Sequence, residues 1–397
     1  MRDQFSLGPR TLTAVSNAAD SSDTTIFTVM TALAEETGAV NLGQGFPDED
    51  GPSAIVEAAV DAMRAGHNQY APLPGVSALR EAIAAHQRRR YGLELDPATE
   101  VQVTFGATEA LAAAALAFVG PGDEVVMLDP AYDSYEPVVR RAGGGVRRIP
   151  LTPPDWRVEA QAVERAVTPR TRMLLLNSPH NPTGRVLDPE ELELLADACR
   201  RHDLVAVTDE VYEHLVYDGR HLPVATLPGM RERTVTISSL GKTHSLTGWK
   251  IGWASGPADL IARLRGVKQF LTFAGGTPLQ HAAAVGMRLP DRDVAELMEA
   301  LRSKRDRLAA GLGEAGFAVL RTASTYFMNA DARPLGQDDA AALCVRLPHE
   351  AGVVAIPVSA FSAVPDARLR SIVRFAFCKR DDVLDEGIAR LRAWAAR

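Results

Sequence analysis

The sequence is poor in cysteine and in aromatic residues, and it has no long apolar run. Among its 397 residues are three cysteines, at positions 199, 344 and 378, and aromatic residues make up 6%. An odd number of widely spaced cysteines predicts neither a disulfide framework nor a metal site, so no metal is expected. The apolar run from Leu111 to Val119 is rich in alanine and too short to span a membrane.

The sequence also lacks an excess of positive charge and an apolar N-terminal segment. Its net charge is -7 and lysine and arginine do not cluster, which argues against a nucleic-acid partner. The N-terminal residues lack the apolar core of a signal peptide, so we expect a cytoplasmic protein without a membrane partner. What is present, 46% hydrophobic and 23% charged residues, is typical of a soluble globular protein.

The length of the chain exceeds one ordinary hydrophobic core and predicts two domains. Strands and helices alternate through the first two thirds of the chain, which is the α/β pattern, and short strands lie between helices in the last hundred residues. We expect an N-terminal arm and helix (1–45) that joins the small domain, a large domain (46–285) and a small α+β domain (286–397). After residues 251–253 the chain is expected to leave the large sheet.

Polar clusters follow five predicted strands, at the points where the strands end. The strands are predicted at 101–105, 124–128, 172–176, 204–208 and 234–237, and the clusters begin at Gly106, Asp129, Asn177, Asp209 and Ser238. In open α/β sheets, ligands bind at the C-terminal ends of the strands. Each cluster alone is equally typical of an ordinary turn or helix cap, but together they predict one site.

The stretch from Ser238 to Lys250 carries the most specific chemistry. Lys242 follows a β-branched strand in a turn of small and hydroxyl residues, and Lys250 comes eight residues later. A lysine becomes a nucleophile toward carbonyls when burial or a cationic neighbour lowers its pKa. The pattern favours a Schiff-base lysine beside a phosphate cup, which pyridoxal phosphate requires, while a solvated turn is the alternative.

Two further features indicate anion binding. Gly106 to Ala110 open a helix directly after a strand, and the free N–H groups and dipole of a helix N-terminus favour phosphate. Arg374 lies in an apolar strand, where its guanidinium needs an anion. That anion is either a buried acid or a substrate carboxylate held by two hydrogen bonds.

In chain order, these motifs resemble the fold-type I aminotransferases of class I/II. The matching segments are Asn41–Pro47, Tyr70, Gly106–Glu109, Asn177–Gly184, Asp209–Tyr212, Ser239–Lys250 and Arg374. The chain is most similar to the kynurenine, glutamine and methionine aminotransferase branch and, within it, to the bacterial N-succinyldiaminopimelate aminotransferases. The resemblance covers roughly residues 24–395.

This resemblance implies a large domain with a mainly parallel seven-stranded sheet between helices, and a smaller α+β domain. It implies pyridoxal 5′-phosphate as cofactor and a homodimer with shared active sites. The implied reaction moves an amino group between an α-amino acid and a 2-oxo acid, with glutamate and 2-oxoglutarate as partner pair. The other substrate is expected to be N-succinyldiaminopimelate-like, or a long-chain, aromatic or sulfur amino acid.

The resemblance also assigns roles to single residues. Lys242 would hold the cofactor and move the substrate proton, and Asp209 would pair with the pyridine nitrogen. Asn181 and Tyr212 would hydrogen-bond the phenolic oxygen, and Tyr132 would stack on the ring. The phosphate would be bound by Gly106, Ala107, Thr108, Ser239, Lys250 and the neighbouring subunit's Tyr70. The substrate would be bound by Arg374, Asn181, Gly43 and Phe27.

Two positions depart from the usual pattern of this branch, and a third, Lys250, departs from many other relatives although this branch often has lysine there. Ala131 stands where another aromatic residue is common, His244 replaces a common phenylalanine, and Lys250 replaces the arginine of many relatives. We expect Ala131 and His244 to lie near the pocket and to affect substrate choice, with His244 acting in packing rather than catalysis.

Two other functions share this pattern. Some bacterial transcription regulators carry an aminotransferase-like sensor domain, but they need a DNA-binding domain that the short arm before Thr24 does not supply. Carbon–sulfur lyases and other elimination or replacement enzymes use the same cofactor-binding residues, so the sequence leaves this alternative open.

Overall fold

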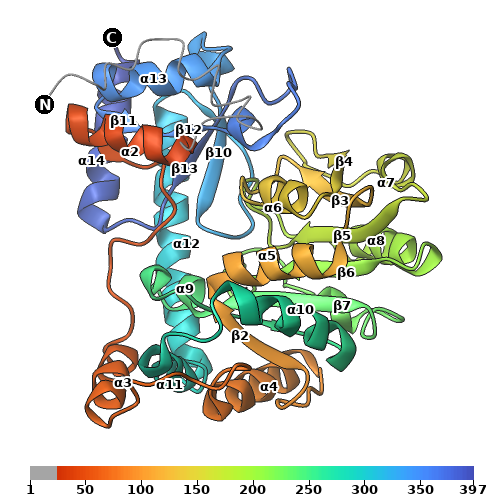
Figure 1. Ribbon diagram of the computed structural model, residues 1–397. Coiled ribbons are helices and arrows are strands. Elements are labelled where there is room, and N and C mark those ends of the chain that lie inside the picture. The colour runs from red at the N-terminus through yellow and green to blue at the C-terminus, as the bar shows by residue number, and fades with distance from the viewer. Residues whose placement is uncertain (1–24) are drawn as a thin grey trace, which may run out of the picture.

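A mixed seven-stranded sheet forms the centre of the computed structural model, which describes residues 25–397 (Figure 1). Most of the predicted N-terminal arm therefore lies outside the described residues. The strand order is β2-β8-β7-β6-β5-β3-β4. The strands are β2 (Val101–Phe105), β3 (Glu124–Asp129), β4 (Gly145–Pro150), β5 (Thr171–Asn177), β6 (Val205–Asp209), β7 (Thr234–Ser239) and β8 (Ile251–Ser255). Only β8 runs against its neighbours in this sheet, so the C-terminal ends of the other six strands face the same way.

Alternating apolar residues place helices on both faces of this sheet. Val125 and Met127 pack with α5 (Gly106–Phe118), α6 (Tyr135–Arg141) and α10 (Ala258–Leu271). Val126 and Leu128, one residue out of phase, pack with α7 (Ala160–Ala166) and α8 (Pro189–Arg201) on the other face. Side chains that alternate in this way are the signature of a sheet buried on both sides. A separate core contains side chains of β2, β8, α3 (Ser53–Arg64), α4 (Ser77–Tyr91) and α11 (Thr277–Gly286).

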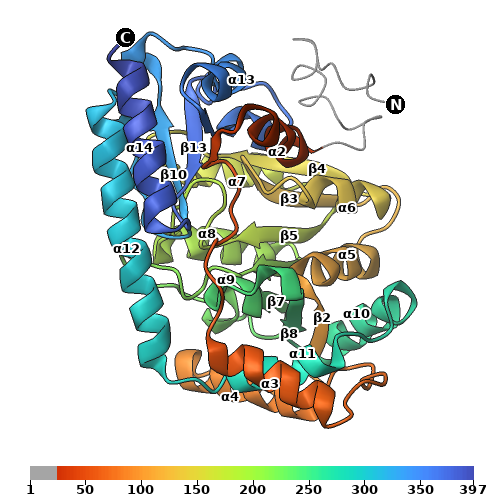
Figure 2. The ribbon, with the colours of Figure 1, turned by 90° about the vertical axis from the view of Figure 1, so that its left-hand side faces the viewer.

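A second, antiparallel sheet has the order β12-β13-β10-β9. Its strands are β9 (Ala318–Val319), β10 (Phe327–Asp331), β12 (Ile356–Pro357) and β13 (Ile372–Ala376), flanked by α13 (Ala340–Glu350) and α14 (Asp381–Ala395). The N-terminal helix α2 (Ile26–Thr37) buries one face in the core of this sheet (Figure 2). Next to it, β1 (Val40–Asn41) pairs in parallel with β11 (Val353–Val354). The domain boundaries stay a prediction.

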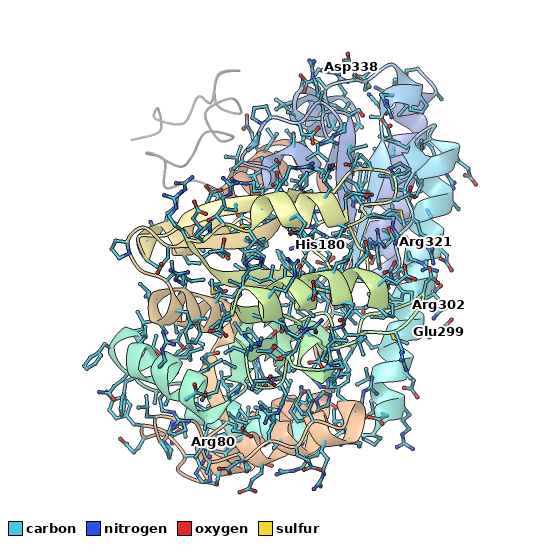
Figure 3. All side chains as sticks on the ribbon, turned by 90° about the vertical axis from the view of Figure 1, so that its right-hand side faces the viewer. Arg80, His180, Glu299, Arg302, Arg321 and Asp338 are labelled. Carbon is cyan, nitrogen blue, oxygen red and sulfur yellow. The ribbon has the colours of Figure 1, made fainter. Side chains whose placement is uncertain are left out.

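The helix α12 (Asp291–Glu314) runs alongside both sheets (Figures 1 and 2). Its residues Glu299 and Arg302 form an ion pair of 3.4 Å (Figure 3). Arg302 also donates a hydrogen bond of 2.9 Å from Nη2 to the carbonyl of Tyr217, in the segment that follows β6. The helix is thereby attached to the large sheet. No helix of residues 25–397 is both long and apolar enough to cross a membrane.

The five predicted strands are all present, but two strands of the large sheet were not predicted. Residues 251–253, which were not predicted as a strand, begin β8 between β2 and β7. The chain leaves the sheet after Ser255, and the helix that follows, α10, still packs against one face of the sheet. Strand β8 is short and contains a glycine, so its local pattern is weak. The edge strand β4 is only half buried and carries Arg147 and Arg148, so it lacks an apolar run.

Candidate active site

A cavity of about 300 Å³ lies at the C-terminal ends of β2, β5, β6 and β7. The small sheet closes its other side with Phe327 and Arg374, and α2 contributes Phe27. The structure brings the following predicted residues together around it: Phe27, Gly106, Ala107, Thr108, Tyr132, Asn181, Asp209, Tyr212, Ser239, Lys242, Lys250 and Arg374. The clusters after these strand ends therefore converge on one site, as the strand-end rule predicts.

Lys242 lies in the short helix α9 (Leu240–Thr243), directly after β7. Its Nζ donates a hydrogen bond of 2.9 Å to the hydroxyl of Tyr326, which itself donates one of 2.6 Å to the carbonyl of Gly45. Burial lowers the pKa of Lys242 to about 8, although the negative charge of Asp209 acts in the opposite direction. A neutral, nucleophilic amine is therefore available near neutral pH.

Asp209 ends β6 and is almost completely buried. It accepts a hydrogen bond of 2.7 Å from the hydroxyl of Tyr135 and one of 3.3 Å from the N–H of Val211. Burial raises the pKa of Asp209 to about 6, while these two hydrogen bonds act to lower it. No cationic side chain of the described residues forms an ion pair with this carboxylate, so it faces the cavity as an acceptor for a cationic nitrogen.

Thr108 and Lys250 form the predicted anion site at the start of α5. The Nζ of Lys250 lies 3.3 Å from Oγ1 of Thr108. A side chain at Gly106 would place its Cβ 3.2 Å from Cε of Lys250, and one at Gly252 would lie 2.5 Å from the carbonyl carbon of Gly106. Two glycines therefore let the β2–α5 turn and the Lys250 side chain approach each other at a helix N-terminus.

Arg374 projects from β13 and is fully buried. Its Nη1 donates to Oδ1 of Asn181 at 2.9 Å and its Nη2 to the carbonyl of Gly43 at 3.1 Å. Its Nε has no hydrogen-bond partner, and no acid within residues 25–397 forms an ion pair with it. The alternative of a structural buried acid is therefore not observed, and the guanidinium keeps donor capacity for a carboxylate in the cavity.

Aromatic rings surround this guanidinium. The Cζ atom of Arg374 lies 3.9 Å from the ring centroid of Phe327, 4.5 Å from that of Phe361 and 5.5 Å from that of Phe27. Burial lowers the pKa of Arg374 to about 10, so it stays protonated at neutral pH. A desolvated cation beside aromatic faces is held in place without a counter-charge of its own.

Several residues of the site were missed by the sequence reasoning. They are Gln44, Tyr135, Tyr326 and Phe327. The spacing of Tyr132 and Tyr135 over one helical turn is a local signal for the second tyrosine. Tyr326 and Phe327 belong to the small sheet, and nothing in their local sequence indicates that they meet the large sheet.

Residues 37–391 match the family described as aminotransferase class I and II. The chain belongs to this family. It is an aminotransferase. An N-succinyldiaminopimelate aminotransferase from Mycobacterium tuberculosis is 55% identical to it. The two structures agree with a TM-score of 0.92 over 94% of this chain and 97% of the other. A methionine aminotransferase from Escherichia coli is 42% identical, with a TM-score of 0.90 over 93% and 97% of the two chains. Kynurenine–oxoglutarate transaminase 3 of Mus musculus is 38% identical over 94% of this chain and 88% of its own.

Four predicted positions of this aminotransferase do not line the cavity of the single chain: Gly43, Tyr70, Ala131 and His244. Tyr70 is 81% exposed and packs only edge-on against Phe273, with ring centroids 5.7 Å apart. Ala131 and His244 do not line the cavity themselves. The N–H of Ala131 donates to the carbonyl of Phe361, whose ring packs on Arg374, and the effect of both residues on substrate choice stays a prediction. The helical turn of α9 directs His244 to a second, much smaller cavity.

Proposed function

We propose that this aminotransferase uses pyridoxal 5′-phosphate and that the cavity around Lys242 holds it. The cofactor requires an amine for its aldehyde, an anion site for its phosphate and an acid beside its ring nitrogen. Lys242, the Thr108–Lys250 anion site and Asp209 meet these requirements in one cavity. The observation that carries the proposal is that one cavity contains a half-buried lysine of lowered pKa and a buried carboxylate that has no cationic partner among the described residues.

Different residues of the cavity carry out different parts of the reaction. When bound, the cofactor supplies an electron sink for the negative charge that develops at the substrate Cα. Lys242 is placed to take and return the Cα proton at Nζ, and Tyr326 orients that atom. Asp209 holds a proton on the ring nitrogen, because its charge is buried and directed by Tyr135.

The residues around Arg374, on the side of the cavity formed by the small sheet, orient the substrate. Arg374 and Asn181 hold the α-carboxylate, and the carbonyl of Gly43 fixes the guanidinium plane. Tyr132 and Phe27 line the cavity with aromatic surface that excludes water from the reacting atoms. The chain thus supplies both orientation and a desolvated environment.

As substrates we propose an N-succinyldiaminopimelate-like amino acid, which donates its amino group, and 2-oxoglutarate, which accepts it and becomes glutamate. The 55% identity to the M. tuberculosis enzyme of that name supports this choice. The test is a panel of amino donors, each with 2-oxoglutarate: the N-succinylated diamino acid, methionine, glutamine, kynurenine and S-substituted cysteines. We expect the highest kcat/KM for the N-succinylated compound. A higher value for methionine or kynurenine would overturn the choice of substrate but not the use of the cofactor.

The active unit in this proposal is a homodimer with shared sites. Tyr70 lies in a region of exposed large apolar side chains, including Phe270 at 84% exposure and Phe273 and Leu271 nearby in sequence. Such a patch is typical of a protein interface. Thr108 and Lys250 are also exposed in the single chain, which leaves the anion site open for the neighbouring subunit's Tyr70.

A further inference from the structure

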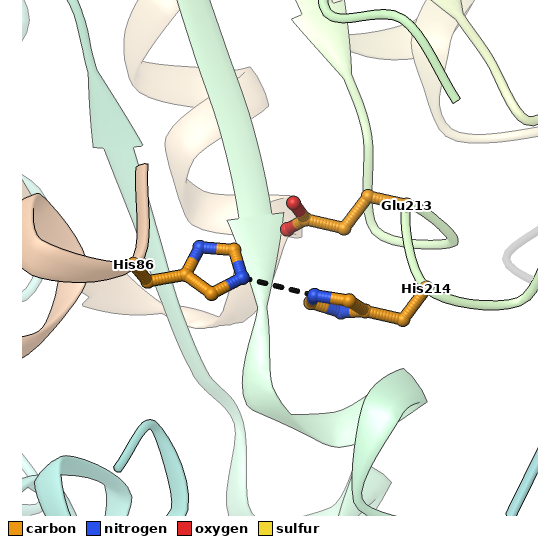
Figure 4. A group of neighbouring side chains, drawn as sticks. All are labelled: His86, Glu213 and His214. Carbon is orange, nitrogen blue, oxygen red and sulfur yellow. Dashed lines mark hydrogen bonds between the residues drawn. The ribbon is translucent and has the colours of Figure 1, made fainter. Parts of the chain in front are cut away.

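A second group of chemically active side chains lies on the far side of the Lys242 turn. His86 comes from α4, and Glu213 and His214 follow β6 (Figure 4). One ligand atom from each residue lies within 4.8 Å of the other two. His86 and Glu213 are buried, and His214 is 8% exposed. None of the three lines the active-site cavity, so the proposed function leaves them without a role.

The carboxylate of this group is a buried charge without a cationic partner. Glu213 accepts hydrogen bonds of 2.6 Å from the hydroxyls of Tyr91 and Ser238, one at each oxygen. No lysine or arginine of the described chain forms an ion pair with Glu213. A buried anion of this kind is costly unless a cation neutralises it.

The two imidazoles of the group are held in a fixed arrangement. A neutral imidazole binds a metal through the lone pair of one ring nitrogen. The Nε2 atoms of His86 and His214 face each other at 2.9 Å (Figure 4). On the other side of its ring, Nδ1 of His214 lies 2.8 Å from Oγ1 of Thr243, the kind of outer contact that fixes a histidine ligand.

The distance between the two histidine nitrogens is close to that of a tetrahedral site. Zinc–nitrogen bonds of about 2.0–2.1 Å at tetrahedral angles place two ligand nitrogens about 3.3 Å apart. The observed 2.9 Å therefore has to widen by only a few tenths of an ångström. A cavity of about 20 Å³ adjoins both histidines and gives room for one water-sized fourth ligand.

We propose that His86, His214 and Glu213 bind a divalent transition metal ion, with Zn²⁺ as the metal that this donor set suits. Two imidazoles and a carboxylate are a common set of zinc ligands, and the ion neutralises the buried carboxylate. The site is independent of the cofactor. Arg89 and Arg90, which also line the small cavity, are partly neutralised by Asp291 at 3.5 and 3.8 Å.

The site contacts the catalytic turn at two points. Thr243, which His214 contacts, is the residue after Lys242, and Ser238, which donates to Glu213, lies near the end of β7. A bound ion would therefore restrain the Lys242 turn on the side that faces away from the active-site cavity. Because the ion binds the folded chain, it would also raise the thermal unfolding midpoint of the full chain.

The test is a calorimetric titration of the chelator-treated full-length protein with ZnCl₂, followed by Co²⁺ substitution. We expect one ion per chain, and for Co²⁺ the absorption bands of a tetrahedral nitrogen–oxygen site. His86→Gln and Glu213→Gln should each weaken Zn²⁺ binding at least tenfold. The matched control is His281→Gln, since His281 stacks on His67 with ring centroids 4.0 Å apart but has no carboxylate ligand in its group.

Two results would overturn the proposal. One is the absence of saturable binding to the wild-type chain, which would show that the histidines share a proton instead. The other is binding that His281→Gln abolishes and His86→Gln leaves intact. If the His86 and Glu213 variants fail to fold, X-ray absorption of the Zn²⁺-loaded wild type decides the matter, because the site requires two imidazole ligands.

Discussion

The guanidinium of Arg374 and the side-chain amide of Asn181 are joined by a hydrogen bond of 2.9 Å inside the protein. Arg374 belongs to the small antiparallel sheet, and Asn181 follows β5 of the large sheet. The side of the cavity that we propose to bind the substrate is therefore assembled from both sheets.

This contact leads to a prediction about substrate binding. Arg374→Ala should lower kcat/KM by a factor that corresponds to a loss of about 2–5 kcal/mol of transition-state stabilisation. The reason is that the substrate carboxylate loses its desolvated cationic partner. The loss should be similar for every α-amino acid, since all share the carboxylate. Steady-state kinetics measure the effect, and cofactor absorbance should be retained. Arg374→Lys, which keeps the charge but not the bidentate geometry, should recover only part of the rate; an unchanged rate in the alanine variant would show that Arg374 is structural.

The lowered pKa of Lys242 can be measured without cofactor. Its amine should react with an acylating reagent along a titration curve centred at about pH 8, since the protonated form is unreactive. Peptide mass spectrometry of the labelled apoprotein gives the curve. In the urea-unfolded chain the midpoint should return toward the ordinary value of 10.5. A midpoint that is the same in folded and unfolded protein would refute a buried, activated lysine.

Asp209→Asn tests the electrostatic interaction between Asp209 and Lys242. The negative charge of Asp209 acts to raise the pKa of Lys242, so its removal should shift the labelling midpoint to lower pH. A shift to higher pH would mean that the two groups are not coupled as the structure indicates.

Asp209 should also destabilise the apoprotein at neutral pH. Burial raises its pKa from 3.8 to about 6, so between these values the folded chain binds more protons than the unfolded chain. Stability is therefore lost as pH rises through this window, and the cost persists above it. Two pKa units correspond to about 3 kcal/mol. Asp209→Asn should raise the free energy of unfolding at about pH 7.5 by about 1–3 kcal/mol, while it abolishes turnover.

Urea unfolding of the apoprotein across this pH range measures the effect. The gain from Asp209→Asn should shrink as the pH falls and vanish at about pH 4, where the folded wild-type acid is already protonated. A gain that does not depend on pH would point to packing rather than to charge.

The sequence was sufficient for five of the seven strands of the large sheet and for one side of the site. Asp209, Asn181 and Lys242 could be located because each follows a strongly apolar parallel strand, and the ends of such strands meet at one edge. The other side could not be derived in the same way. Tyr326 and Phe327 reach the cavity only because the small sheet docks on the large one, and local periodicity carries no information on docking.

The position of Tyr70 predicts that two subunits share each active site. Variants of Tyr70 and of Lys242 should each be inactive as homodimers. After subunit exchange, one site of the mixed dimer has both wild-type residues, so activity should return to roughly a quarter of the wild-type level, by the statistics of random pairing. The control is a mixture kept under conditions that block exchange. No recovery, with exchange demonstrated by mass, would contradict a shared site.

The last prediction separates amino transfer from elimination. An aminotransferase passes nitrogen from glutamate to an acceptor oxo acid, so 2-oxoglutarate should accumulate in step with the new amino acid, and no free ammonia should form. An elimination enzyme instead releases ammonia and an oxo acid from a single amino acid. The assay follows both products with glutamate and with S-substituted cysteines as the only amino donors, and a Lys242→Ala variant serves as control because it lacks the base that moves the Cα proton. Family membership favours transfer. Ammonia released in proportion to a consumed cysteine derivative, together with no reaction of glutamate, would show that this chain uses the same residues for elimination.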